Sequence, residues 1–295
     1  MPEAMLTSYL IGFATWLGLM TLATVTLVVT GRRFYDKRSG WLDRWKRLQK
    51  HLHSRTLSGI FKGPIGWLSH RLSGSGFVWL NLVVGGVIIL CLSWLFGEIS
   101  ENVMEGDPLT ELDQQLSDFF HEHRTTEVTA AMKVVTEMGS ASFITLGTIL
   151  AAVLLLIWKG WYRLGTLMLA VPGGALMNLL LKYLIKRDRP FFENPILSFS
   201  NYSFPSGHTM GATLFYGVLA AFVIVSKAGW KWKVGAVFLA ALIVQIVGFS
   251  RIYLGAHFLS DVVAAATAGI AWMALCVTVM DAIRRRRMGR DRIAR

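Results

Sequence analysis

Cysteine is almost missing from this chain, which has only Cys91 and Cys276 in 295 residues. Each of the two lies inside an apolar run, and the topology argued below places them near opposite faces of a membrane. A disulfide between them is therefore not expected, and two isolated thiols do not provide the cysteine spacing of a zinc site. The cysteine content thus excludes a disulfide framework and a zinc-stapled fold.

Acidic residues are also scarce, because 18 Asp and Glu stand against 30 Lys and Arg and give a formal net charge of +12. In a soluble protein this excess would suggest a nucleic-acid partner. Here the basic residues lie between apolar spans, so they indicate membrane topology and no nucleic acid is expected. Hydrophobic residues make up 54% of the chain and the mean hydropathy is +0.49, values typical of a polytopic membrane protein.

Several other signatures are missing as well. The sequence has no glycine-rich nucleotide fingerprint, no internal repeat and no low-complexity tract apart from an arginine-rich end. The polar motifs do not recur in the two halves, which disfavours an inverted-repeat transporter. The first apolar run lacks a basic region before it and a small-residue cleavage site after it, so we interpret it as a retained span rather than a signal peptide.

Seven apolar runs are long enough, or nearly so, to cross about 30 Å of hydrocarbon at about 1.5 Å per residue. The predicted fold class is therefore all-α, a polytopic membrane helical bundle of about seven transmembrane helices. The runs cover residues 8–30, 76–97, 140–158, 163–185, 207–226, 232–250 and 258–281.

The charge of the connecting segments predicts one orientation for the whole chain. Residues 31–73 carry eleven Lys or Arg against only Asp36 and Asp43, whereas residues 98–138 carry ten Asp or Glu against Arg124 and Lys133. By the positive-inside rule the first segment is cytoplasmic and the second faces outward. We expect a span plus basic segment over 1–73, a catalytic membrane domain over 74–283 and a basic cytoplasmic tail over 284–295.

Two segments outside the spans have amphipathic character. Residues 41–48 mix aromatic, leucine and basic side chains and form either a helix lying on anionic lipid or a solvated basic linker. In the outer segment, apolar residues recur at near-helical spacing and predict a short helix resting on the outer surface. They are Leu112, Leu116, Phe119 and Phe120.

A first pair of candidate site residues is Lys182 with Arg189, which precedes Pro190. They are seven positions apart, about two turns if the helix continues, so both side chains could face one cavity. Two neighbouring cations repel unless an anion lies between them, and the planar fork of arginine suits phosphate oxygens. Snorkelling to lipid headgroups is the alternative for Lys182. The intervening residues 186–188 are interpreted as interfacial charges.

The stretch from Phe204 to His208 is a second candidate. Pro205 fits the first turn of a helix, and Ser206 and Gly207 leave the following amides uncovered. Such a helix mouth attracts anions, and His208 adds a group that can exchange protons near neutral pH. An ordinary N-terminal turn with an interfacial histidine is the alternative.

The third candidate begins at Ser250 and Arg251 and continues to His257 and Asp261. The last two are four apart, so on a helix they share a face and the carboxylate can hold one imidazole nitrogen. The other nitrogen is then available as a nucleophile or base. The predicted topology places all three candidate groups at the outer ends of the last four spans, where clustered charge has an energetic cost that calls for a function.

In this order and spacing, the three groups resemble the three-part signature of the type 2 phosphatidic-acid phosphatase (PAP2) superfamily, whose soluble relatives are the vanadium haloperoxidases. The resemblance covers about residues 140–281, and Gly139-Ser140 is similar to the usual start of the family pattern. The first span and the basic segment after it look like an addition to the family's six-helix core.

The resemblance implies a phosphatase that uses no metal and no cofactor. Lys182, Arg189 and Arg251 would bind phosphate oxygens, with Ser206 and the Gly207 amide completing the cradle. His257 would attack phosphorus to give a phosphohistidine, Asp261 would orient it, and His208 would protonate the leaving oxygen. Phosphoryl transfer requires positioned positive charge of this kind.

The expected partners are a lipid phosphate substrate and the surrounding membrane lipids, and the sequence does not specify an oligomeric state. An outer-leaflet site suits undecaprenyl diphosphate, phosphatidylglycerol phosphate or phosphatidic acid in a bacterial inner membrane. A lipid phosphotransferase or a lipid A phosphatase is an alternative, because the motif shares its first half-reaction; a non-enzymatic lipid-binding or transport protein is a third. The aromatic residues between 191 and 204 could line the lipid entry or belong to the interfacial aromatic belt.

Overall fold

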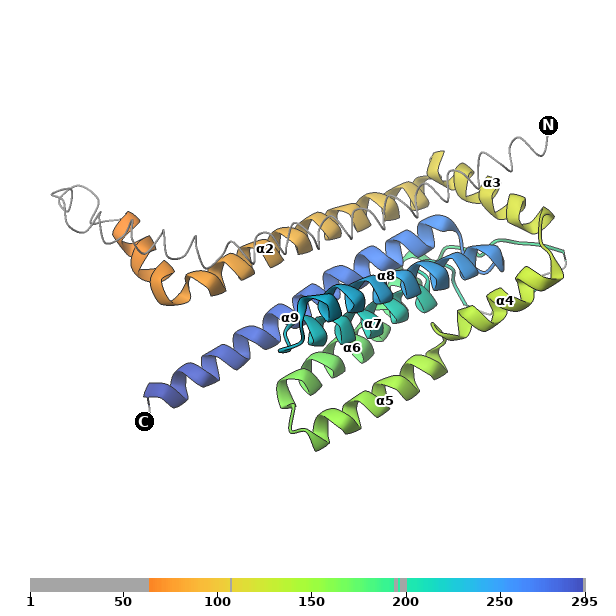
Figure 1. The fold of residues 1–295 in the computed structure, drawn as a ribbon. Coiled ribbons are helices and arrows are strands. Elements are labelled where there is room, and N and C mark those ends of the chain that lie inside the picture. Colours follow the sequence, from red (N-terminus) through yellow and green to blue (C-terminus); the bar gives the residue numbers. More distant parts are fainter. Residues whose placement is uncertain (1–63, 107, 194–195, 197–200, 294–295) are drawn as a thin grey trace. The chain divides into compact units, whose positions relative to one another are not determined.

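The structure is a computed structural model that describes residues 64–106, 108–193, 196 and 201–293 (Figure 1). Within these residues every regular element is an α-helix, as the sequence predicts. The helices are α2 (Pro64–Glu105), α3 (Pro108–Glu122), α4 (Thr126–Glu137), α5 (Ala141–Ile157), α6 (Trp161–Ile185), α7 (Gly207–Ile224), α8 (Trp230–Tyr253) and α9 (Leu259–Ile293).

Six stretches of the described helices are long and apolar enough to cross a membrane. They are Gly85–Glu105, Thr126–Ile157, Trp161–Ile185, Gly207–Ile224, Trp230–Tyr253 and Leu259–Arg284. Each overlaps one of the predicted runs, so six of the seven predicted spans are confirmed by length and composition. The predicted first span, 8–30, and the amphipathic segment 41–48 lie outside the described residues.

The chain divides into two compact units, one of residues 1–81 with 229–238 and one of residues 82–228 with 239–295. All candidate site residues lie in the second unit. There α7 packs against α6 and α9, and buried side chains such as Leu167, Met210 and Leu214 fill the space between them. Ala264 and Ala265 of α9 are fully buried, and such small side chains let helices approach closely in a membrane.

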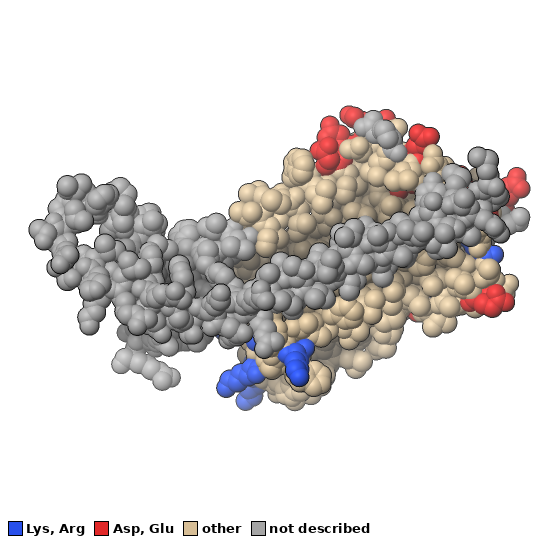
Figure 2. All heavy atoms as spheres, turned by 45° about the horizontal axis from the view of Figure 1, so that its top comes forward, with Lys and Arg blue, Asp and Glu red and all other residues tan. Residues whose placement is uncertain are grey.

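The predicted outer helix corresponds to α3. Leu112, which the sequence places on its apolar face, departs from the amphipathic pattern. Phe120 is buried against Phe249 and Tyr253, whereas Leu112 is 41% exposed. Asp113 lies on the inward face and is only 1% exposed. In Figure 2 most acidic side chains lie away from the larger group of basic ones, as the segregation of charge along the sequence predicts.

Two helix ends set the position of the site. Ser206 is the N-cap of α7, and its hydroxyl accepts a hydrogen bond from the amide of Thr209 at 3.4 Å. Pro205 therefore precedes the cap, so its predicted place in the first turn is wrong. Helix α6 ends at Ile185, because Lys186 adopts a left-handed backbone conformation with φ of 52°. Arg189 consequently lies in a loop and not on a continued helix.

Candidate active site

His257 and Asp261 form a buried pair at the turn from α8 into α9. His257 Nδ1 lies 3.2 Å from Asp261 Oδ2, and the two residues are 2% and 0% exposed. The same carboxylate oxygen accepts a hydrogen bond from the amide of Phe258 at 3.0 Å and another from the Ser203 hydroxyl. With Nδ1 held in this way, Nε2 is the imidazole nitrogen left to react.

The surroundings of His257 keep its imidazole neutral. The pKa of His257 is lowered from its ordinary 6.5 to about 3, chiefly by burial and in smaller part by the positive charges of Arg189 and Arg251, against the opposing effect of Asp261. Because the imidazole is then uncharged at neutral pH, its Nε2 keeps the lone pair that a nucleophile requires.

Arg189 faces the reactive side of His257. Its Nη1 lies 3.3 Å from His257 Nε2 and donates to the carbonyl of Ala256 at 2.5 Å. Its Nε and Nη2 donate to the carbonyl and side-chain oxygen of Asn201 at 2.9 and 2.6 Å. Burial lowers the pKa of Arg189 to about 10, while Asp261 opposes the change, so the guanidinium is charged at neutral pH.

Lys182 approaches the same place from the last turn of α6. Its Nζ donates to the carbonyls of Tyr202 and Ser203, at 2.5 and 3.0 Å, and the residue is 7% exposed. The predicted alternative, snorkelling to the headgroups, is wrong for Lys182, because its ammonium group points into the protein. Lys182 and Arg189 thus come together although α6 does not extend to Arg189.

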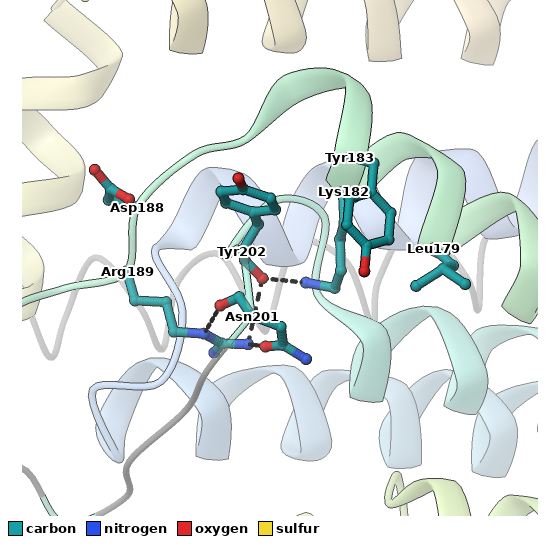
Figure 3. Close-up of a pocket in the computed structure, with 7 residues that line it drawn as sticks. All are labelled: Leu179, Lys182, Tyr183, Asp188, Arg189, Asn201 and Tyr202. Atoms are coloured by element: carbon teal, nitrogen blue, oxygen red, sulfur yellow. Dashed lines mark hydrogen bonds between the residues drawn. The ribbon is translucent and has the colours of Figure 1, made fainter.

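A cavity of about 520 Å³ opens beside these two cations (Figure 3). Figure 3 shows Lys182 and Arg189 both reaching toward the chain at Asn201 and Tyr202. The cavity has both polar and apolar walls. Its lining residues are Leu179, Lys182, Tyr183, Asp188, Arg189, Asn201 and Tyr202.

Arg251 is held by Thr136 at the end of α4. Arg251, 2% exposed, donates from Nη1 to the Thr136 hydroxyl at 2.9 Å. His208 lies in the first turn of α7, two residues after the N-cap Ser206. A β-carbon on Gly139 would lie 3.0 Å from the His208 carbonyl oxygen and 2.6 Å from Val247 Cγ1, so only glycine lets these backbones approach.

The mouth of α7 is joined directly to the dyad. The amide of Ser206 donates to the main-chain carbonyl of Asp261 at 3.1 Å. The Gly207 amide, in the first turn of α7, has no intrahelical acceptor. The eight predicted site residues therefore gather in one place, as clustered phosphate-binding groups require: Lys182, Arg189, Ser206, Gly207, His208, Arg251, His257 and Asp261.

Some site residues are not predicted by the sequence argument. Arg187, interpreted above as an interfacial charge, is a correction: its side chain is 9% exposed and pairs with Asp113 and Asp261 at 2.8 Å each. Ser203 contacts both members of the dyad, and Thr136 holds Arg251. The sequence does contain a sign that Asp113 is unusual. It lies three positions before Leu116, so an acidic side chain stands on the apolar face of α3, where a charge needs a partner.

Two aromatic residues of the loop before α7 differ in exposure. Phe192, in the loop before α7, stacks on His121 with ring centroids 4.1 Å apart, whereas Phe191 is 86% exposed. Within the described ranges, no group of three His, Cys, Asp or Glu side chains is placed to hold a metal ion. Besides Arg187, which pairs with Asp261, the cations Lys182, Arg189 and Arg251 lie near the dyad, and positive charge of this kind suits an anion.

Comparison with known proteins agrees with this chemistry. Residues 161–285 match the family described as the PAP2 superfamily. Phosphatidylglycerophosphatase B of Bacillus subtilis (strain 168) is 39% identical over 142 residues, covering 47% of this chain and 68% of that protein. An undecaprenyl-diphosphatase of Sulfolobus acidocaldarius is 31% identical over 117 residues, covering 38% of this chain and 52% of that protein.

Among solved structures, the chain is similar to a transmembrane PAP2-type phosphatidylglycerolphosphate phosphatase from Bacillus subtilis. The two superpose with a TM-score of 0.58 at 27% identity, over 64% of this chain and 93% of the other. Over that part of the chain the helical fold is thus shared with a transmembrane enzyme.

Proposed function

The chain belongs to the PAP2 superfamily, in its membrane lipid phosphatase branch, and from this premise we propose that it releases phosphate from a phosphorylated membrane lipid through a phosphohistidine intermediate. One observation carries the proposal. His257 is buried, is held at Nδ1 by Asp261, and presents Nε2 to the guanidinium of Arg189. A phosphate bound by that guanidinium would lie within reach of the nucleophile.

The first half-reaction transfers the phosphoryl group to the enzyme. Arg189, Lys182 and Arg251 bind the phosphate oxygens and stabilise the charge that builds up on them. Nε2 of His257 forms a bond to phosphorus as the bond to the lipid oxygen breaks. His208 gives a proton to that oxygen, so the lipid leaves as an alcohol, or as a monophosphate when the substrate is a diphosphate.

The second half-reaction releases phosphate. A water molecule gives a proton to His208 and attacks phosphorus, and the bond between phosphorus and His257 breaks. Inorganic phosphate leaves and the imidazole returns to its neutral form. Asp261 supports both steps, because it keeps the proton of His257 on Nδ1 and stabilises the positive charge of the phosphohistidine ring.

The substrate class follows from the walls of the cavity. Leu179 and Tyr183 are 50% and 61% exposed on α6, a membrane-spanning helix, and both line the cavity that holds Lys182 and Arg189. A headgroup could therefore sit at the cations while its chain stays in lipid. Phosphatidylglycerol phosphate is the first candidate because of the Bacillus relative, and undecaprenyl diphosphate is the second because of the Sulfolobus relative.

Phosphate release from defined lipids tests the proposal. Purified protein in detergent and EDTA should release inorganic phosphate from at least one of phosphatidylglycerol phosphate, undecaprenyl diphosphate and phosphatidic acid, and His257→Ala should abolish release. No release from any of them by the wild type, or loss of release in EDTA, would contradict the proposal. If label from the donor appears in a second lipid instead of free phosphate, the enzyme is a phosphotransferase.

We further propose that the site faces the outside of the cell membrane, as the charge bias along the sequence predicts. Spheroplasts and inside-out vesicles that contain the protein, given a short-chain phosphatidic acid that does not cross the bilayer, test this placement. Intact spheroplasts should release phosphate without added detergent. Release from sealed inside-out vesicles alone would contradict an outer site.

A further inference from the structure

A buried ion-pair bridge connects the outer helix α3 to the catalytic carboxylate. We propose that Asp113 and Arg187 are positioning residues, which fix the orientation of Asp261 and through it that of His257. This inference rests on the proposed function, because it assigns a role in the same reaction. Neither residue belongs to the three sequence groups that predict the site.

The bridge is continuous from α3 to α9. Arg187 Nη2 donates to Asp113 Oδ2, and Arg187 Nη1 donates to Asp261 Oδ1, both at 2.8 Å. Ser260 closes the bridge, since its amide donates to Asp113 Oδ1 at 3.0 Å and its hydroxyl donates to Asp113 Oδ2. The guanidinium also lies over the Phe258 ring, 4.2 Å from the ring centroid.

Burial shows that the bridge is not a surface ion pair. The side chains of Asp113 and Asp261 are 0% exposed and that of Arg187 is 9% exposed. A carboxylate without water needs partners for its lone pairs, and one guanidinium fork supplies a hydrogen bond to each of the two acids. Removing Arg187 would leave two buried carboxylates without this shared cation.

The bridge controls the orientation of Asp261 because the two carboxylate oxygens have different partners. Oδ1 accepts from Arg187, while Oδ2 accepts from Ser203 and Phe258 and faces His257 Nδ1. With Oδ1 fixed, the plane of the carboxylate is fixed, and Oδ2 stays directed at the imidazole. Rotation of Asp261 would release Nδ1 and let the ring turn away from the bound phosphate.

Arg187 holds a second component of the site by its main chain. Its carbonyl accepts a hydrogen bond from the amide of Ser203 at 2.8 Å. Ser203 is the residue whose hydroxyl contacts both His257 and Asp261, and whose own carbonyl accepts from Lys182. Arg187 therefore holds both Asp261 and Ser203, the two residues whose side chains contact the Nδ1 side of the His257 imidazole.

Substitutions of Arg187 test whether it orients Asp261 for the reaction or only stabilises the fold. Arg187→Met should lower kcat by about 10- to 100-fold, by analogy with the loss seen when a group that orients a metal-ligating histidine is removed. KM and the inhibition constant of inorganic phosphate should change less than about threefold, because Lys182, Arg189 and Arg251 still bind the phosphate. Arg187→Lys keeps the charge without the two-pronged fork and should recover part of kcat.

The double variant Asp113→Asn/Arg187→Met addresses the risk that the single variant fails to fold. It removes one of the two carboxylates that would otherwise be buried without a cation, so the melting temperature should recover in part relative to Arg187→Met. A positioning role predicts that kcat stays low in the double variant. Asp118→Asn is the matched control, because Asp118 is an exposed acid on the same helix, and it should leave kcat unchanged.

The outcomes distinguish the two proposals. If the wild type releases no phosphate from any lipid, the proposed function fails. If the wild type is active and the double variant has wild-type kcat, or if kcat in Arg187→Met falls only in proportion to folded protein, the positioning role is overturned while the function stands. Low kcat with unchanged KM in a folded double variant supports the bridge.

Discussion

Replacing Thr136 by valine tests whether the end of α4 sets the phosphate site. The change removes one hydroxyl with almost no change in volume. In the structure that hydroxyl accepts a hydrogen bond from Arg251 Nη1 at 2.9 Å, and the two residues are 5% and 2% exposed. Water is therefore poorly placed to replace the lost acceptor, and the guanidinium must shift or leave this N–H without its present acceptor.

The magnitude follows from the kind of bond. A hydrogen bond to a charged group contributes about 1.5–3 kcal/mol, and a buried donor that loses its acceptor costs a similar amount. Because Arg251 can reorient in part toward bound phosphate, we expect the lower end of that range. About 1.4 kcal/mol corresponds to a tenfold change in rate, so kcat/KM should fall by roughly 10- to 30-fold.

The assay is phosphate release from the best lipid substrate, with Thr148→Val as control. Thr148 is equally buried, at 6%, but its hydroxyl only donates to the carbonyl of Ile144 in its own helix at 2.7 Å. Thr148→Val should therefore leave kcat/KM within about twofold of the wild type, because the Thr148 hydroxyl holds no side chain of the predicted site. Equal losses in the two variants would refute the claim that Thr136 acts through Arg251.

Three further predictions concern the proposed acid His208, the close backbone approach at Gly139 and the proposed nucleophile His257. His208→Ala should slow turnover of alkyl phosphates more than that of diphosphates, whose leaving group needs less protonation; equal losses in kcat on both substrates would remove His208 as the acid. Gly139→Ala should lower both the melting temperature and kcat, because the new β-carbon would meet the His208 carbonyl at 3.0 Å, whereas Gly86→Ala, which meets nothing within 4 Å, should change neither. The pKa of His257 is lowered to about 3, chiefly by burial, so below pH 6.5 the unfolded chain takes up a proton that the folded chain does not. The free energy of unfolding should therefore decrease as the pH is lowered, by up to about 1.4 kcal/mol per pH unit. Between pH 7.5 and 5.5 the melting temperature should therefore fall more in the wild type than in His257→Gln; equal falls would show that His257 titrates normally in the folded protein.

Local spacing explains why much of the site could be predicted. His257 and Asp261 are four positions apart at the start of a helix, a separation that brings side chains together whatever surrounds them. The start of α7 at Gly207 likewise follows from the capping ability of Ser206. Arg189 lies beyond the end of α6, because Lys186 turns the backbone before that residue, so its approach to Lys182 does not follow from helical spacing.

Contacts between distant segments explain what could not be predicted. Arg187 has an ordinary position among charged residues near the end of a span, and its role depends on Asp113, 74 positions earlier. Thr136 and Arg251 are 115 positions apart, and Ser203 and Asp261 are 58 apart. Periodicity reports which face of its own helix a residue occupies, but it does not report which other helix lies opposite.

The membrane character, the six spans in the described residues and the family could all be predicted from the sequence, because apolar length and short motif spacings are properties of single helices. The contacts of Asp113, Arg187, Ser203 and Thr136 with the predicted site could be seen only in the folded protein. The physical reason is that a buried charge must find partners wherever packing brings them, and packing joins segments that are far apart in the chain.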